Sequence, residues 1–144
     1  MNISIATRNE YAQLVEHDHH ISTDMMKCKI DQGEIIVAIK NTSVMGWLRY
    51  GYFWDSIPFM NMLNIIEEYR GRGIGTQLAS YWEAMLRDRG FREVLTSTSA
   101  NERGQFLYRK LGYKDCEALL FPNEPLEIIL HKIIAPEQNK FPLP

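Results

Sequence analysis

The sequence predicts an α/β (α+β) fold: a mixed, mostly antiparallel central sheet of six to seven strands, flanked by about four helices. Segments rich in β-branched and aromatic residues recur along the chain, which is typical of strands. Between them lie segments with apolar residues three and four positions apart, which is typical of helices that pack one face against a sheet. A glycine-rich turn at 71–75 joins one predicted strand directly to the longest helical pattern.

The size and composition of the chain fit a single domain. Its 144 residues are 45% apolar and 24% charged, and a domain of about 150 residues buries roughly 70% of the surface of its unfolded chain. We expect one domain over residues 1–134. Residues 135–144 contain three prolines and a polar run, which predicts a C-terminal tail.

Charge and hydropathy argue against two classes of partner. A net charge of −2 gives no general attraction to nucleic acid. No apolar run reaches the ~18 residues of a membrane helix, and the N-terminus lacks a signal-peptide core. We therefore expect a cytoplasmic protein that binds neither nucleic acid nor a membrane. Cys28 and Cys116 lie far apart without metal-ligand spacing, which favours reduced structural thiols over a disulfide.

Cap and turn signals divide the first 66 residues into four strands and two helices. Thr7 and the segment 22–24 are suitable helix N-caps, and the segment 31–33 is a suitable helix end. The expected elements are a strand at 3–6, a helix from Thr7 to Glu16, a helix between 22–24 and 31–33, an antiparallel hairpin of strands at 34–40 and 44–53, and a strand at 59–66.

The segment His17-Asp18-His19-His20 falls between the two predicted helices. Three histidines in four residues raise the question of a metal site. The fourth histidine, His131, is distant in sequence, and no partner motif accompanies the cluster. We therefore expect a solvated loop and no metal.

The rest of the chain shows equally clear helix ends. Gly90 and Gly112 suit the position just after a helix, and Asn101 suits an N-cap. The expected elements are a helix from 74 to 89, a strand at 91–98, a short helix opened by Asn101, and strands at 113–121 and 126–133.

The glycine turn has the composition of an anion-binding site. Gly71, Gly73 and Gly75 allow a tight backbone with φ > 0, so main-chain N–H groups can approach a bound oxyanion closely. The start of the following helix adds unpaired N–H donors and the positive end of its dipole. Arg70 and Arg72 contribute mobile positive charge. The ligand predicted here is a phosphate or pyrophosphate.

Two common nucleotide motifs do not fit this turn. A Walker A loop ends in Gly-Lys-Ser/Thr, whereas Gly75 is followed by Thr76 and Gln77. A Rossmann turn has Gly-x-Gly-x-x-Gly and an acidic residue at the end of the next strand, and that strand here ends in Thr96-Ser97-Thr98-Ser99.

The segment Arg70-Gly71-Arg72-Gly73-Ile74-Gly75 closely resembles the Arg-x-x-Gly-x-Gly acetyl-CoA-binding motif of the GNAT (Gcn5-related N-acetyltransferase) family. A second segment, 101–113, resembles the family's C-terminal motif, in which an asparagine opens a short helix and a tyrosine follows seven residues later. The resemblance covers residues 60–113 well. It implies a GNAT-like fold and acetyl-CoA as cosubstrate.

The resemblance also implies roles for individual residues. The strand before the turn would grip the pantetheine arm, the turn would hold the pyrophosphate, and Tyr108 would act as general acid for the departing thiolate. The implied cofactor-binding residues are Leu63, Ile65, Ile66, Arg70, Gly71, Arg72, Gly73, Ile74, Gly75, Thr76, Asn101 and Tyr108.

We expect an N-acetyltransferase that acts on a small-molecule amine by direct transfer in a ternary complex. The general base is not identified, because the strand before the turn carries Asn61 and Asn64 but no carboxylate or histidine. A protein N-terminal or lysine acetyltransferase and a non-catalytic acetyl-CoA-binding or regulatory module are the alternatives. Dimers are common in the family, so a homodimer is a further option.

Overall fold

The computed structural model describes residues 1–136 and confirms the predicted mixed α/β fold, with a mostly antiparallel sheet of seven strands and four α-helices. The chain divides into two compact units, Met1–Gly51 with Met60–Trp82, and Tyr52–Phe59 with the chain from Glu83 onward. Of the predicted tail at 135–144, residues 137–144 lie outside the described residues.

The observed elements follow the predicted order. The α-helices are α1 (Tyr11–His17), α2 (Thr23–Asp31), α3 (Ile74–Asp88) and α4 (Gly104–Lys110), with short 3-10 helices at Arg8–Glu10 (η1) and Glu67–Tyr69 (η2). The strands are β1 (Asn2–Ile5), β2 (Ile35–Lys40), β3 (Ser43–Phe53), β4 (Ile57–Ile65), β5 (Glu93–Ser99), β6 (Lys114–Leu119) and β7 (Glu127–Ile133).

Strands β1 to β4 follow one another in sheet order as they do in sequence. β2 pairs antiparallel with β1 and with β3, so that Val37 lies opposite both Ser4 and Trp47. The β2–β3 hairpin turns through Asn41 and Thr42, which both have positive φ (50° and 69°). Such a turn matches the right-handed twist of its strands, and asparagine tolerates it well.

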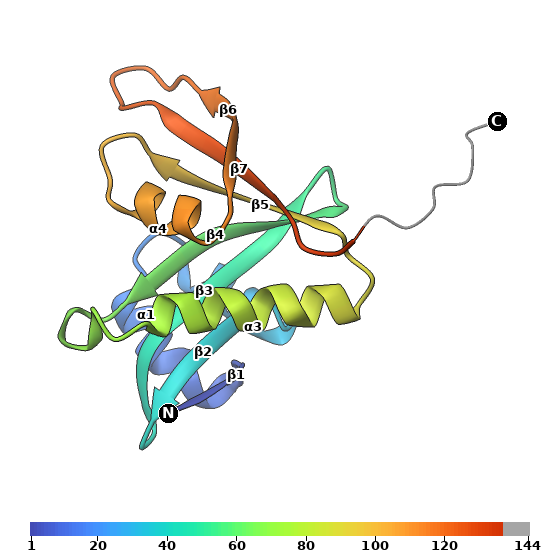
Figure 1. Ribbon diagram of the computed structural model, residues 1–144. Helices are drawn as coiled ribbons and strands as arrows, with labels where there is room; N and C mark the ends of the chain where they lie inside the picture. The colour runs from blue at the N-terminus through green and yellow to red at the C-terminus, as the bar shows by residue number, and fades with distance from the viewer. Residues whose placement is uncertain (137–144) are drawn as a thin grey trace. The chain divides into compact units, whose positions relative to one another are not determined.

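Both faces of these strands are covered, because alternate residues point to opposite faces. On one face, Val37 and Trp47 belong to a buried cluster with Leu14 of α1 and Met26 of α2. On the other face, the Tyr50 ring lies 5.6 Å from the ring of Trp82 on α3. Figure 1 shows α3 in front of β2 and β3, with α1 and α2 behind them.

The starts of the first two helices follow the predicted caps with one change. Thr7 and Glu10 form a reciprocal capping box, but they cap the 3-10 turn that leads into α1 rather than α1 itself. Ser22 caps α2, its Oγ accepting from the Met25 main-chain N–H. Met25 is exposed, whereas Met26 and Ile30, four residues apart, form the buried stripe of α2.

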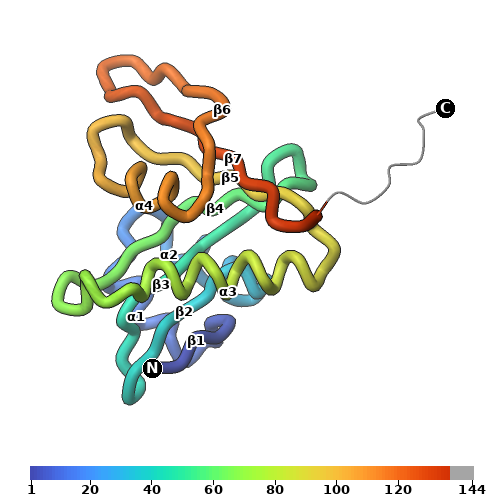
Figure 2. The backbone as a smooth tube through the Cα atoms, in the orientation of Figure 1, coloured from blue at the N-terminus to red at the C-terminus, as the bar shows by residue number. Residues whose placement is uncertain are grey.

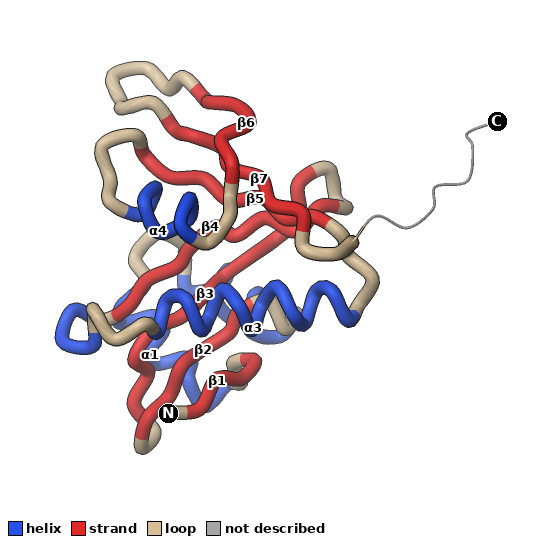
Figure 3. Tube along the Cα trace, in the orientation of Figure 1, coloured by secondary structure: helices blue, strands red, loops and turns tan. Residues whose placement is uncertain are grey.

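The second unit contains strands in the order β5-β7-β6, all antiparallel. β6 ends at Leu119, two residues before the predicted end, and a long loop leads to β7 (Figure 3). Within this unit Glu83 is buried. It accepts hydrogen bonds from Tyr113 Oη at 2.9 Å and Lys132 Nζ at 2.7 Å. Burial, with the charge of Glu83, raises the pKa of Tyr113 far above its usual value, so this phenol stays a donor.

We expect Lys132→Met to destabilise the protein by about 2 kcal/mol or more, because the buried Glu83 carboxylate loses its cation. Lys114→Met is the matched control, since Lys114 is exposed and has no ion pair within residues 1–136. Urea denaturation of both variants measures the difference. Equal losses would show that the Glu83–Lys132 contact contributes no stability.

Candidate functional site

The glycine turn lies between η2 and α3, and two of its three glycines have positive φ, whereas Gly75 lies within α3. Gly71 and Gly73 have φ of +77° and +79°, a region that favours glycine. An added Cβ at either position would meet no heavy atom within 4 Å, so the main chain is open to a ligand there. α3 begins at Ile74, and the Gln77 N–H is the donor to the Gly73 carbonyl. Figure 2 shows the chain looping out and back between β4 and α3.

Arg70 is tied to the end of β4, whereas the sequence suggested a mobile charge. Its Nε donates to the main-chain oxygen of Ile65 at 2.8 Å, and one terminal nitrogen reaches Asn64 Oδ1 at 3.4 Å. The Arg72 guanidinium lies 5.7 Å from the centre of the Tyr69 ring. Both arginines are exposed, so their remaining donors face solvent beside the glycine turn.

The end of β4 carries the three predicted pantetheine contacts, Leu63, Ile65 and Ile66, all half-buried. The Ile66 N–H donates to the Met45 carbonyl of β3. Gly46 of β3 lies directly against this segment: an added Cβ there would sit 2.5 Å from Ile65 Cδ1 and 3.0 Å from the Asn64 carbonyl oxygen. The structural role of Gly46 was missed from the sequence, because a lone glycine in a strand indicates close approach without naming the partner.

Tyr108 lies on α4 and is 7% exposed. Burial raises the pKa of its phenol to about 12, against the opposing effect of a hydrogen bond with Thr96. Its ring lies 5.9 Å from that of Tyr113. The phenol is therefore protonated throughout the neutral range and is able to donate a proton.

Asn101 does not cap α4, so the prediction of an N-cap was wrong. The helix begins at Gly104, and Arg103 occupies the cap position without a side-chain bond. Asn101 lies in the preceding turn, where its Oδ1 accepts from Ser99 Oγ at 2.6 Å. The local bond to Ser99 competes with capping, as short polar side chains often do in turns.

The predicted site residues divide between the two units. The strand end and the glycine turn, Leu63 to Thr76, both belong to the first unit. Arg70 links the turn to the strand end through its hydrogen bond to Ile65. Asn101 and Tyr108 belong to the second unit.

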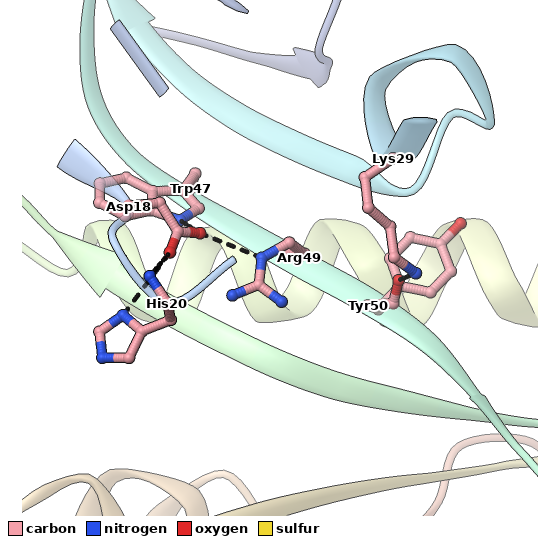
Figure 4. Close-up of polar contacts among 6 residues, drawn as sticks. All are labelled: Asp18, His20, Lys29, Trp47, Arg49 and Tyr50. Atoms are coloured by element: carbon pink, nitrogen blue, oxygen red, sulfur yellow. Dashed lines mark hydrogen bonds and ion pairs between the residues drawn. The ribbon is translucent and has the colours of Figure 1, made fainter. Parts of the chain in front are cut away.

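The link between α1 and α2 is not the fully solvated loop that the sequence suggested. His19 and His20 are exposed, but the Asp18 side chain is completely buried. Asp18 Oδ2 accepts from Trp47 Nε1 at 3.2 Å and from Arg49 Nε at 3.0 Å, as Figure 4 shows. Burial alone would raise the pKa of Asp18, but the hydrogen bond and charge of Arg49, with smaller contributions from the His20 N–H and Trp47, hold it below its usual value.

Further features of the described residues concern metal ions, cysteines, membranes and a pocket. Within residues 1–136, no group of three or more His, Cys, Asp or Glu side chains is placed to hold a metal ion. Cys28 and Cys116 are both free, and both are exposed rather than buried. None of the described helices is long and apolar enough to cross a membrane.

A pocket of about 390 Å³ lies over the α1–α2 link, with Asp18, His19 and Met26 among its lining residues.

Comparison with known proteins identifies the family of the chain. Residues 4–113 match the sequence model of the acetyltransferase (GNAT) family, which is more than half of the chain. The chain belongs to the GNAT family. The expected resemblance is thereby confirmed, and the match includes the glycine turn, Asn101 and Tyr108.

Two sequence relatives of this GNAT chain share parts of it. An uncharacterized N-acetyltransferase of Chlorobaculum tepidum is 28% identical over 91 residues, which are 63% of this chain and 56% of that protein. N-alpha-acetyltransferase 30 of Schizosaccharomyces pombe is 36% identical over 56 residues, which are 38% of this chain and 37% of that protein. This chain thus spans about half, or less, of the length of these curated relatives.

Solved structures share the fold of this GNAT chain. One is an aminoglycoside 6'-N-acetyltransferase complexed with coenzyme A, with a TM-score of 0.78 at 19% identity. The alignment covers 96% of this chain and 100% of that one. At this identity the likeness establishes the fold alone.

We expect Gly46→Ala to weaken acetyl-CoA binding and to lower stability by about 1–3 kcal/mol, because the new methyl group displaces Ile65 or the Asn64 carbonyl. Gly104→Ala is the control, since its Cβ would lie at ordinary distances of 3.4 Å from Thr98 Oγ1 and 3.6 Å from Tyr108 Cε2. Calorimetric titration with acetyl-CoA and thermal denaturation measure both effects. If Gly46→Ala bound acetyl-CoA with wild-type affinity, the position of this strand end would not matter for cofactor binding.

Proposed function

We propose that the chain is an acetyl-CoA-dependent N-acetyltransferase that moves the acetyl group to an amine of a small molecule by direct transfer in a ternary complex. The observation that carries this proposal is the glycine turn of a GNAT-family chain. Gly71 and Gly73 are held in the left-handed region, with open space over the main chain and α3 directly behind them. Main-chain N–H groups in that arrangement suit a pyrophosphate.

The first unit would supply most of the cofactor contacts. The half-buried strand end at Leu63, Ile65 and Ile66 would contact the pantetheine arm, and the exposed guanidinium of Arg72 lies beside the turn. Arg70 fixes the turn to the strand, which keeps the cost of ordering the site out of the binding step. The turn residues Gly71, Gly73, Ile74, Gly75 and Thr76 would surround the pyrophosphate, and Asn101 is a proposed cofactor contact on the family resemblance.

Acetyl transfer forms a carbon–nitrogen bond and breaks the carbon–sulfur bond of the thioester. The amine loses a proton and the departing sulfur gains one. Tyr108 is the proposed donor to sulfur, because its buried phenol, with a pKa of about 12, is protonated at neutral pH. The amine would arrive neutral or give its proton to water, so no protein base is assigned.

A protein N-terminal acetyltransferase is the alternative with specific support, since one relative is N-alpha-acetyltransferase 30. The aminoglycoside enzyme that shares the fold favours a small amine instead. A non-catalytic acetyl-CoA-binding module would keep the glycine turn but would not need a buried, protonated Tyr108. Thiol release with small amines and with short peptides distinguishes the three.

A thermal-shift panel with acetyl-CoA, CoA, ATP and NAD tests the cofactor assignment without knowledge of the acceptor. A ligand at ~1,000 times its dissociation constant stabilises a protein by roughly 4 kcal/mol. We expect stabilisation by the two CoA species alone. A preference for ATP or NAD would contradict the proposal.

We expect Tyr108→Phe to lower kcat by about 100-fold or more, the usual contribution of a positioned acid, with little change in acetyl-CoA affinity. Tyr81→Phe is the control, because Tyr81 on α3 is 37% exposed. Steady-state thiol release and calorimetric titration measure the two quantities. Unchanged turnover in Tyr108→Phe would remove this residue from the acid role.

We expect Arg70→Ala to weaken acetyl-CoA binding by about ten-fold or more, because it removes a charge-assisted bond that holds the turn to β4 and a cation beside the pyrophosphate. Arg8→Ala, which removes an exposed arginine of the same unit, is the control. Equal affinity in the two variants would contradict the pyrophosphate assignment.

A further inference from the structure

A buried ion pair lies between the α1–α2 link and β3, and the proposed chemistry does not use it. The Asp18 side chain is fully buried, and that of Arg49 is 6% exposed. Asp18 also accepts from Trp47 Nε1 and from the His20 main-chain N–H, so its two oxygens already have three donors. The position of the Arg49 guanidinium is therefore fixed by a carboxylate that is itself held firmly.

Arg49 uses only one of its five N–H donors. Its Nε–H bonds Asp18, and the two terminal nitrogens have no hydrogen-bond partner within residues 1–136. Figure 4 shows these nitrogens pointing away from Asp18. Within residues 1–136, the fully buried side-chain atoms without a partner are Trp82 Nε1 and Arg92 Nε, so the unpaired terminal nitrogens of Arg49 are open to solvent and to a ligand. The planar fork matches a carboxylate, which it binds through two parallel bonds.

Arg49 lies on β3, the strand next to the β4 end proposed for the pantetheine arm. Residues 47, 49 and 51 share one face of β3, and Trp47 packs there against α1 and α2. Gly46 lies against Asn64, and an added Cβ at Gly51 would sit 3.3 Å from Asn61 Nδ2. Arg49 therefore lies beside the part of β4 between Asn61 and Asn64. From Gly46 to Arg49 is about 10 Å along a strand, a span that a small molecule can bridge.

The hydrogen-bond donors left unused on this face favour an acidic acceptor over a polycation. Asp18 is paired with Arg49. Glu34 is paired with Lys29 at 3.0 Å, and Lys29 also donates to the Tyr50 carbonyl at 2.8 Å (Figure 4). Both carboxylates are thus neutralised, whereas the Arg49 fork keeps four unused donors.

We infer that Arg49, oriented by Asp18, binds a carboxylate of the acceptor. The acceptor is then a small amine that also carries a carboxylate, such as an amino acid. This inference rests on the proposed acetyl transfer and names the substrate class of that site. Asp18 is a positioning residue in this arrangement, because it acts through Arg49.

The test compares acetyl transfer from radiolabelled acetyl-CoA to three acceptor mixtures: the standard amino acids, their decarboxylated amines, and aminoglycosides. We expect the amino acids to be acetylated at least about ten-fold faster, as a charge-assisted, bidentate contact allows. Arg49→Lys keeps the charge but loses the fork, so this preference should fall to near unity. The acetyl-CoA thermal shift should be unchanged.

Arg8→Lys is the matched control, because Arg8 forms a bidentate pair with Asp31 on the exposed surface of the same unit. It should keep the wild-type preference. Equal or faster labelling of the amines or aminoglycosides would overturn the inference. The inference would also be overturned if acetyl-CoA stabilised the protein but no amino acid became labelled. If Arg49→Lys fails to fold, the wild-type comparison still decides. If acetyl-CoA gives no shift, the proposed function fails, and this inference fails with it.

Discussion

The turn from β4 into α3 is the constraint on which the first unit depends. Gly71 and Gly73 take left-handed backbone conformations that other residues adopt only with strain, and they let the chain reverse within a few residues. α3 then places Ile74, Leu78 and Trp82 in the core, all almost fully buried. Because that face is anchored by packing, the start of the helix is held rigidly beside the open main chain of the turn.

The strand that enters this turn is fixed from two sides. Arg70 bonds the Ile65 carbonyl, and Gly46 of β3 approaches so closely that no larger side chain fits without movement. The absence of a side chain at Gly46 therefore allows Ile65 to lie directly against β3. A strand end held in this way suits a site in which reacting groups must be placed within a fraction of an ångström.

Two buried tyrosines of the second unit both keep their phenol protons but have different hydrogen-bond partners. Tyr113 donates to the buried carboxylate of Glu83, which also accepts a hydrogen bond from Lys132. The phenol proton of Tyr113 is therefore part of a structural network. Tyr108 packs against Tyr113 and bonds Thr96 instead of a carboxylate. Its proton is not committed to a carboxylate, as the proposed role of general acid requires.

The order and type of nearly every element could be predicted from the amino-acid sequence, because strand periodicity, cap residues and glycine turns act over a few neighbouring residues. The sequence also located the glycine turn and Tyr108 through motifs that are continuous in sequence. Asn101 failed as a cap because its neighbour Ser99 offered a competing bond. Only the tertiary structure showed that Asp18, placed among three histidines, is buried against Trp47 and Arg49, about 30 residues away. The environment of a charged side chain is set by whatever the fold packs over it, and that information is absent from its sequence neighbours.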